Sequence, residues 1–173
     1  MSMLSRLTIC TAISIAAPAA AQSPQFGQPT TPADVSPWDI SIGPDGIGLP
    51  PGRGTAIRGA EVYLAKCQSC HGEKGAGRPN DALVGGIGSL GSDKVPVKTV
   101  GSYWPYATTL FDYVRRAMPF QETKSLTNDE LYAVSAYILN LNGIVGENDI
   151  LDSESLPKVK MPNRDGFILF PRN

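Results

Sequence analysis

Apolar residues recur at helical spacing in three stretches near the middle of the chain, and each stretch predicts a helix. The first helix covers about residues 56–66. The second begins after Pro105, because proline suits the first turn of a helix. It must end at Ala117 or Met118, because Pro119 disfavours the helical conformation in the residue before it.

The third helix has the clearest boundaries. The run from Thr127 to Glu130 forms a capping box at its start, and apolar side chains then repeat at intervals of three and four residues. Gly143 suits the left-handed conformation that ends many helices. We therefore place this helix at residues 128–141.

The chain on either side of these helices is rich in proline and glycine. Residues 22–52 contain seven prolines, five glycines and no Lys or Arg, a composition that disfavours helices and central strands. This stretch predicts an extended arm. It is either a flexible linker or, because Trp38 and Ile40 are too apolar for a pure spacer, a segment packed on the domain or on a partner. Residues 144–173 predict an extended tail.

The first 21 residues have the layout of a secretory signal peptide. Arg6 precedes an apolar stretch of about eleven residues, short of the roughly 20 that a membrane-spanning helix needs. Small residues follow, so we expect cleavage before Gln22 and export to the periplasm, with an uncleaved anchor as the alternative. The sequence thus predicts four segments: a signal peptide (1–21), a Pro/Gly-rich extended arm (22–54), one domain (55–142) and an extended C-terminal tail (143–173).

Candidate chemistry is concentrated in the run Cys67-Gln68-Ser69-Cys70-His71. Two thiols at this spacing can add to the vinyl groups of a haem, and the histidine that follows is placed to bind the iron. A structural zinc site needs about four Cys or His ligands, whereas His71 is the only histidine and Cys10, within the signal peptide, is the only other cysteine. A dithiol redox site is the other alternative, but it is typical of a βαβ pattern that the sequence lacks. We expect one covalent haem c.

Methionine is the favoured ligand on the other side of the iron, because neutral sulfur opposite imidazole suits electron transfer. Met118 is the preferred candidate, since it lies at a predicted helix end from which its sulfur can reach over the haem. Met161 lies in the tail, so we assign it to packing or to a partner contact. The second ring nitrogen of His71 needs an acceptor, and the backbone carbonyl of Pro79 is a candidate, with a plain turn proline as the alternative.

Further candidate pocket residues come from the glycine-rich loop before the second helix and from that helix. The loop offers four apolar side chains: Leu83, Val84, Ile87 and Leu90. Tyr103, Trp104 and Tyr106 either hold haem propionates through their OH and NH groups or are ordinary core aromatics. Arg115 and Arg116 either pair with a propionate or an acidic partner, or form a solvated helix end.

The order of helix, C-Q-S-C-H run, loop, Met-Pro pair and capped last helix resembles class I cytochromes c over residues 55–142. This resemblance implies an all-α class I cytochrome c fold, with helices packed around one covalent haem. It also implies that Gly59 and Tyr63 pack against Tyr137 of the last helix.

Three runs are similar to the cytochrome c subunits of periplasmic sulfane and sulfite dehydrogenases, including the Sox sulfur-oxidation system. They are Ile42 to Pro50, Gly101 to Pro119, and Lys158 to Phe167. The resemblance implies a molybdenum-cofactor dehydrogenase subunit as electron donor, and we expect a downstream cytochrome c or oxidase as acceptor. Some of those cytochromes carry two haems, whereas this chain has a single C-x-x-C-H run.

We expect a periplasmic monohaem protein that transfers single electrons and performs no substrate chemistry itself, so no catalytic residue is assigned. The alternatives are a general diffusible carrier and a haem enzyme or gas-binding protein with an open sixth position. The latter is disfavoured because no second histidine exists for distal catalysis. With 15 basic and 16 acidic residues, charge gives no case for binding nucleic acid or an anionic membrane. We assign the arm and tail to docking, and predict that residues 54–145 alone still hold the haem.

Overall fold

The computed structural model describes residue 27 and residues 29–93 and 95–168. The expected signal peptide lies outside these residues. The three longest helices are α2 (Ala56–Lys66), α5 (Ala107–Ala117) and α6 (Asn128–Leu141), which confirms the three predicted helices. None of the helices in the described part of the chain is long and apolar enough to cross a membrane.

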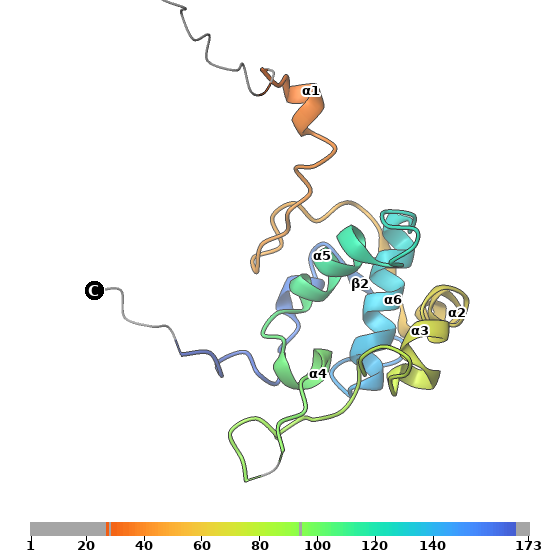
Figure 1. Ribbon diagram of the computed structural model, residues 1–173, viewed down its shortest axis with the longest axis vertical. Coiled ribbons are helices and arrows are strands. Elements are labelled where there is room, and N and C mark those ends of the chain that lie inside the picture. Colours follow the sequence, from red (N-terminus) through yellow and green to blue (C-terminus); the bar gives the residue numbers. More distant parts are fainter. Residues whose placement is uncertain (1–26, 28, 94, 169–173) are drawn as a thin grey trace, which may run out of the picture.

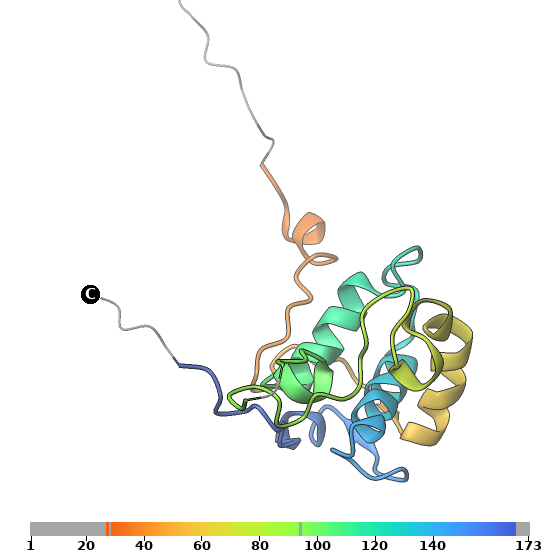
Figure 2. The ribbon, with the colours of Figure 1, turned by 60° about the horizontal axis from the view of Figure 1, so that its bottom comes forward.

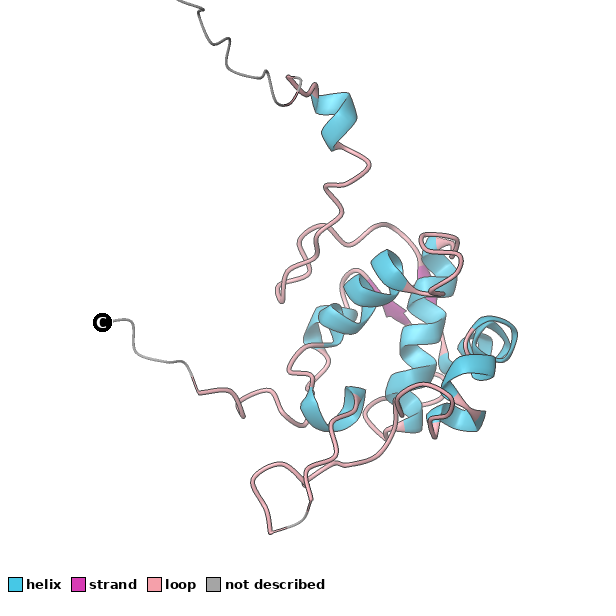
Figure 3. Cartoon of the chain, in the orientation of Figure 1, coloured by secondary structure: helices cyan, strands magenta, loops and turns pink. Residues whose placement is uncertain are grey.

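The remaining elements are short. They are α1 (Pro32–Val35), α3 (Gln68–His71), α4 (Val100–Tyr103), the 3₁₀ turns η1 (Glu73–Gly75) and η2 (Leu156–Lys158), and the strands β1 (Arg53–Gly54) and β2 (Leu151–Asp152). Figure 3 shows how helices and long loops account for nearly the whole fold, with the two strands confined to one small pair.

Helix α6 lies at the centre of the fold, with α2 and α3 on one side and α4 and α5 on the other (Figure 1). Figure 2 shows the three long helices in the same order from a second direction. Helix α6 begins at a reciprocal cap, in which the Thr127 hydroxyl accepts from the Glu130 N–H and the Glu130 carboxylate accepts from the Thr127 N–H. Gly143, with φ of +69°, follows its last turn as predicted.

The backbones of α2 and α6 approach closely at Gly59. A Cβ at this position would overlap the backbone carbonyl of Ala133, so any side chain here would push the two helices apart. One turn further along, the rings of Tyr63 and Tyr137 pack with centroids 5.3 Å apart. The packing implied for Gly59 and Tyr63 against Tyr137 is therefore confirmed. This contact positions the site, because α2 leads directly into Cys67.

Helix α5 packs on the other side of α6. Leu110, Phe111 and Val114 are buried, and the Phe111 ring lies 4.6 Å from the ring of Tyr132 between centroids. Fully burying an apolar side chain of this size stabilises a fold by roughly 1.5–3 kcal/mol. The apolar stripe predicted for the second helix is therefore its core-facing side.

The inner part of the arm, residues 40–54, lies against α5 and α6. Asp112 of α5 accepts a hydrogen bond from the Ile42 N–H at 3.0 Å, and the Arg115 guanidinium donates to the Ile40 carbonyl at 3.4 Å. These bonds join groups about 70 positions apart in the sequence. They hold the arm on the domain, which agrees with one of the two packing possibilities left open by the sequence.

Both arginines at the end of α5 serve this arm contact. Arg116 donates to the Asp112 carboxylate at 2.9 Å and to the Ser41 hydroxyl at 2.9 Å. Arg115 and Arg116 contact Asp112 and the arm. They are therefore neither a propionate-binding pair nor a purely solvated helix end, the two roles that the sequence allowed.

The expectation of an arm without helices is wrong at α1. Thr31 accepts from the Asp34 N–H, the Asp34 carboxylate accepts from the Thr31 N–H, and Pro32 stands in the first turn. A reciprocal cap and a first-turn proline stabilise one turn of helix even in a proline-rich segment. This turn has no buried residue.

Residues 151–161 of the tail fold back onto the domain, whereas residues 164–168 are exposed. Strand β2 pairs antiparallel with β1, so that Arg53 lies opposite Asp152. Leu151, Leu156 and Met161 are all buried in the core. These side chains are unavailable to a partner, so the docking assignment is wrong for this part of the tail. The segment 54–145 alone would lack three core side chains.

Replacing Leu156 by alanine should lower the free energy of unfolding by about 2–5 kcal/mol, because the side chain is fully buried and its removal leaves a cavity. Denaturant unfolding followed by circular dichroism measures this. Leu64→Ala is the matched control: Leu64 is 64% exposed, and its loss should change the free energy by no more than about 0.5 kcal/mol. Equal small effects of both substitutions would show that the tail is not part of the core.

Candidate haem-binding site

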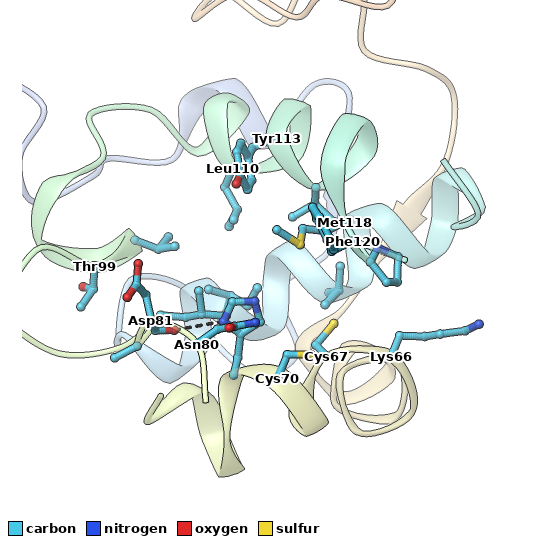
Figure 4. Close-up of a pocket in the computed structure, with 18 of the residues that line it drawn as sticks. Lys66, Cys67, Cys70, Asn80, Asp81, Thr99, Leu110, Tyr113, Met118 and Phe120 are labelled. Carbon is cyan, nitrogen blue, oxygen red and sulfur yellow. Dashed lines mark hydrogen bonds between the residues drawn. The ribbon is translucent and has the colours of Figure 1, made fainter. Parts of the chain in front are cut away.

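A cavity of about 530 Å³ opens between α5, α6 and the segment around α3. Its walls are largely apolar and include Leu110, Val114, Val134 and Ile138. Figure 4 shows the sulfur atoms of Cys67 and Cys70 on one side and the sulfur of Met118 across the cavity from them. The volume is typical of cofactor and small-molecule sites.

The two thiols are placed by the junction of α2 and α3. The Cys67 N–H donates to the Tyr63 carbonyl at 2.9 Å, as the last bond of α2, and the Cys67 carbonyl accepts from the N–H groups of Cys70 and His71 at 3.1 and 3.0 Å. The chain therefore turns at Cys67, and both thiols and the imidazole line the same cavity. The cysteines are half-buried and not joined to each other.

His71 has its second ring nitrogen satisfied by a backbone carbonyl. Nδ1 lies 3.0 Å from the Asp81 carbonyl oxygen, the contact drawn as a dashed line in Figure 4. The expectation that Pro79 supplies this carbonyl is therefore wrong: Pro79 is exposed and does not line the cavity. With Nδ1–H as donor, Nε2 is left to bind a metal.

Met118 directly follows α5 and enters the cavity. Its N–H donates to the Val114 carbonyl at 3.1 Å, whereas its own backbone is extended, as Pro119 after it favours. Met161 is buried in the core and does not line the cavity. Packing, one of the two roles expected for Met161, is confirmed.

The aromatic cluster divides between the cavity and the surface. Trp104 lines the cavity and packs edge-on against Tyr113, with ring centroids 5.6 Å apart. Tyr103 instead packs against Phe167 of the tail, and Tyr106 lies beneath the guanidinium of Arg164. The structure therefore does not bring the three aromatics together as one propionate-binding group.

The glycine-rich loop contributes less to the cavity than its composition indicates. Of the four apolar candidates in the loop, Leu83 lines the cavity. Ile87 is half exposed, and Val84 packs near Gly75. The walls come from helices and loops together, and this loop also supplies Asn80, Asp81 and Ala82.

The environment of Cys67 counts against a dithiol redox site. Burial, with a smaller contribution from the charge of Cys70, raises the pKa of Cys67 to about 11. Redox-active C-x-x-C pairs depend on a thiol with a lowered pKa. A thiol that stays protonated at neutral pH is a poor nucleophile in disulfide exchange.

The residues present fit a haem c. Two thiols and an imidazole lie on one wall of an apolar cavity, and a thioether faces them, which is the donor set of c-type cytochromes. Among the described residues, no three His, Cys, Asp or Glu side chains form a cluster that could hold a metal ion. The two thiols, the imidazole and the thioether thus favour a porphyrin-held iron.

Comparison with known proteins decides the family. Residues 54–138 match the family model described as cytochrome c oxidase, cbb3-type, subunit III. A chain in the crystal structure of the sulfane dehydrogenase SoxCD from Paracoccus pantotrophus is 41% identical, with a TM-score of 0.76, over 84% of this chain and 72% of that one. This protein belongs to the cytochrome c family. No curated protein matches it significantly.

Membership confirms the predicted all-α class I cytochrome c fold and the covalent haem c. When bound, the haem supplies an iron that changes valence by one electron. The cytochrome is therefore a haem electron-transfer protein.

Sequence reasoning missed several features of the site, of which the Asp81 carbonyl and Tyr113 are two examples. The Asp81 carbonyl carries no residue-type signal, because every residue has one. Tyr113 does carry a signal, since it lies three positions after Leu110 and therefore on a neighbouring face of α5.

Denaturing electrophoresis with a haem stain, together with intact mass, should show one haem attached to a chain that begins at Gln22. Both cysteines of the mature chain are consumed by attachment, so a thiol reagent should find none free. A haem-free mature protein with two free thiols would contradict the assignment of the cavity.

Met118→Ala should abolish the weak far-red sulfur-to-iron absorption of the ferric cytochrome and lower its reduction potential, because a soft neutral ligand favours reduced iron. Met161→Ala is the control. It should keep that band while lowering the free energy of unfolding by about 2–5 kcal/mol, since Met161 is a core residue. Loss of the band in Met161→Ala but not in Met118→Ala would show that Met161 of the tail is the iron ligand.

Proposed function

We propose that the cytochrome accepts single electrons from a molybdenum-dependent dehydrogenase that oxidises sulfite or a sulfane sulfur. It passes them to a second cytochrome c or an oxidase. The supporting observation is the 41% identity to a chain of a sulfane dehydrogenase. Residues 54–173 make up about 69% of the chain, so a match over 84% extends well into the arm. The likeness therefore goes beyond the haem-binding body.

The proposed haem contacts follow from the positions in the cavity. Cys67 and Cys70 form the thioether bonds, His71 and Met118 are the axial ligands, and Trp104 packs against the macrocycle. Both cysteines are half-buried, so a haem that they held would have its adjoining edge near the surface. Electrons can cross at that edge without any substrate reaching the iron.

The cytochrome works in the periplasm in this proposal. Export follows from the predicted signal peptide, and covalent haem takes the stabilising role that disulfides have in many exported proteins. Cleavage at Gln22 leaves the arm as the new N-terminal segment.

Docking is assigned to the outer arm, residues 29–39, because the inner arm and much of the tail are used by the domain itself. Every residue of the outer arm is exposed. Trp38 is 72% exposed, with its ring 4.1 Å from the Lys124 ammonium. Asp34 and Asp39 are the only charged residues in this segment, so the surface that receives it should combine an apolar pocket with cationic groups.

A general diffusible carrier is the second candidate. Such a carrier has no use for an exposed arm that carries a tryptophan and two carboxylates. The exposed apolar side chain is therefore the observation that favours a dedicated partner.

Isolation of the cytochrome from its native periplasm tests the proposal. Molybdenum and haem iron should co-purify in a fixed ratio, and sulfite or thiosulfate should then reduce the haem. Iron without molybdenum, and no reduction by either compound, would favour the diffusible carrier.

Trp38→Ala should lower the molybdenum-to-iron ratio of the isolated material at least several-fold, because buried tryptophans are frequent anchors of interfaces. Ile57→Ala, which removes an exposed apolar side chain from α2, should leave the ratio unchanged. A molybdenum-to-iron ratio unaffected by Trp38→Ala would contradict the docking role of the outer arm, but it would not contradict the existence of the dehydrogenase partner.

A further inference from the structure

The carbonyl that contacts His71 belongs to a short segment without regular secondary structure. This segment, residues 80–85, is here called the strap. Its first four residues line the haem cavity. The Asn80 N–H donates to the Cys70 carbonyl at 2.9 Å, and the Leu83 N–H donates to the Gly75 carbonyl at 2.9 Å. These bonds attach the strap to the haem-binding motif and to the turn that follows it.

The side chain of Asn142 also attaches the strap. Its Oδ1 accepts from the Gly85 N–H at 3.2 Å, and its Nδ2 donates to the Leu83 carbonyl at 3.2 Å. Nδ2 also donates to the Ile138 carbonyl in the last turn of α6, at 2.9 Å. One buried amide thus joins the end of a long helix to two backbone groups of the strap.

The side chain of Asn142 is also enclosed by the backbone of α4. A Cβ at Gly101 of α4 would overlap the Asn142 amide, so the helix backbone lies directly against it. Thr99 donates to the Gly85 carbonyl at 2.6 Å and thereby fixes the same end of the strap from α4's cap. The amide therefore has little freedom to turn away.

Only a primary amide meets all three demands at this position. The Gly85 N–H requires an acceptor, while the Leu83 and Ile138 carbonyls require donors. A carboxylate of the same shape can accept but cannot donate, and an aliphatic side chain can do neither. A group left without its partner here is destabilising, because it gives up hydrogen bonds to water without gaining another.

We propose that Asn142 is a positioning residue for the axial histidine. It holds the strap, and the strap holds the Asp81 carbonyl against Nδ1 of His71. That hydrogen bond fixes the ring orientation and raises the basicity of the ligand. The effect passes through Asp81, two residues from the Leu83 carbonyl that Asn142 binds. Asn142 does not itself line the cavity.

The test is hydrogen exchange of the His71 ring Nδ1–H, observed by NMR in the full-length holo-cytochrome. In Asn142→Leu this proton should exchange at least tenfold faster than in the wild type, because the strap opens more often. The reduction potential should also rise, because a weaker hydrogen bond makes the imidazole a poorer donor to ferric iron. The Met118 absorption band should persist.

Asn140→Leu is the matched control. Asn140 lies at the same end of α6 and donates to the Val145 carbonyl at 2.9 Å, away from the strap. It should lose stability without faster exchange of the ring proton. Asn142→Ser, which is smaller but polar, serves if the leucine variant does not mature. Ring-proton exchange equal to the wild type in a folded Asn142 variant would overturn the proposal.

Discussion

The close contact between α2 and α6 at Gly59 is the constraint on which the site depends. Because no side chain separates the helices there, α2 runs along α6 at a fixed distance and delivers Cys67 to the mouth of the cavity. The buried Tyr63 hydroxyl then donates to the Gly72 carbonyl at 2.9 Å, just after the motif. The packing of α2 on α6 thus determines the position of the haem-attachment site, and the five-residue motif supplies the groups that bind the haem.

The facing wall depends on a different set of contacts. Helix α5 packs on α6 through its apolar stripe and ends at Met118, where Pro119 prevents a further turn. The inner arm binds the outside of α5, and the tail inserts Leu156 and Met161 into the core. Segments outside the three long helices therefore support the distal side, which explains why they are not free to dock. The outer arm stays exposed, as do residues 164–168 at the end of the described tail.

The sequence predicts the parts of this structure that local rules determine. The bounds of α2 and α6 agree with the prediction because caps at Thr55 and Thr127 and regular apolar spacing act over a few residues. The haem ligands were identifiable because C-x-x-C-H is itself a local pattern. The burial of the tail was not predictable, because its buried residues follow no helical or strand period and are buried by contacts with distant parts of the sequence.

The contact that satisfies the second ring nitrogen of His71 does not follow from such local rules. Which carbonyl reaches His71 depends on the path of the strap, and this path depends on Asn142, about 60 positions later. Pro79 lies at a suitable distance along the sequence, but it is exposed, and the Asp81 carbonyl makes the contact with His71 instead. Likewise, Thr99 and Ser102 form a capping box for α4. This short helix was not predicted from the sequence.

We infer that the iron transfers electrons with both axial positions filled by His71 and Met118. Carbon monoxide added to the dithionite-reduced holo-cytochrome at neutral pH tests this most directly, because it binds ferrous haem only where an axial position is open. We expect an absorption spectrum that carbon monoxide leaves unchanged. A rapid shift to the spectrum of a carbon monoxide complex would contradict it, and would indicate a haem enzyme or a gas-binding protein.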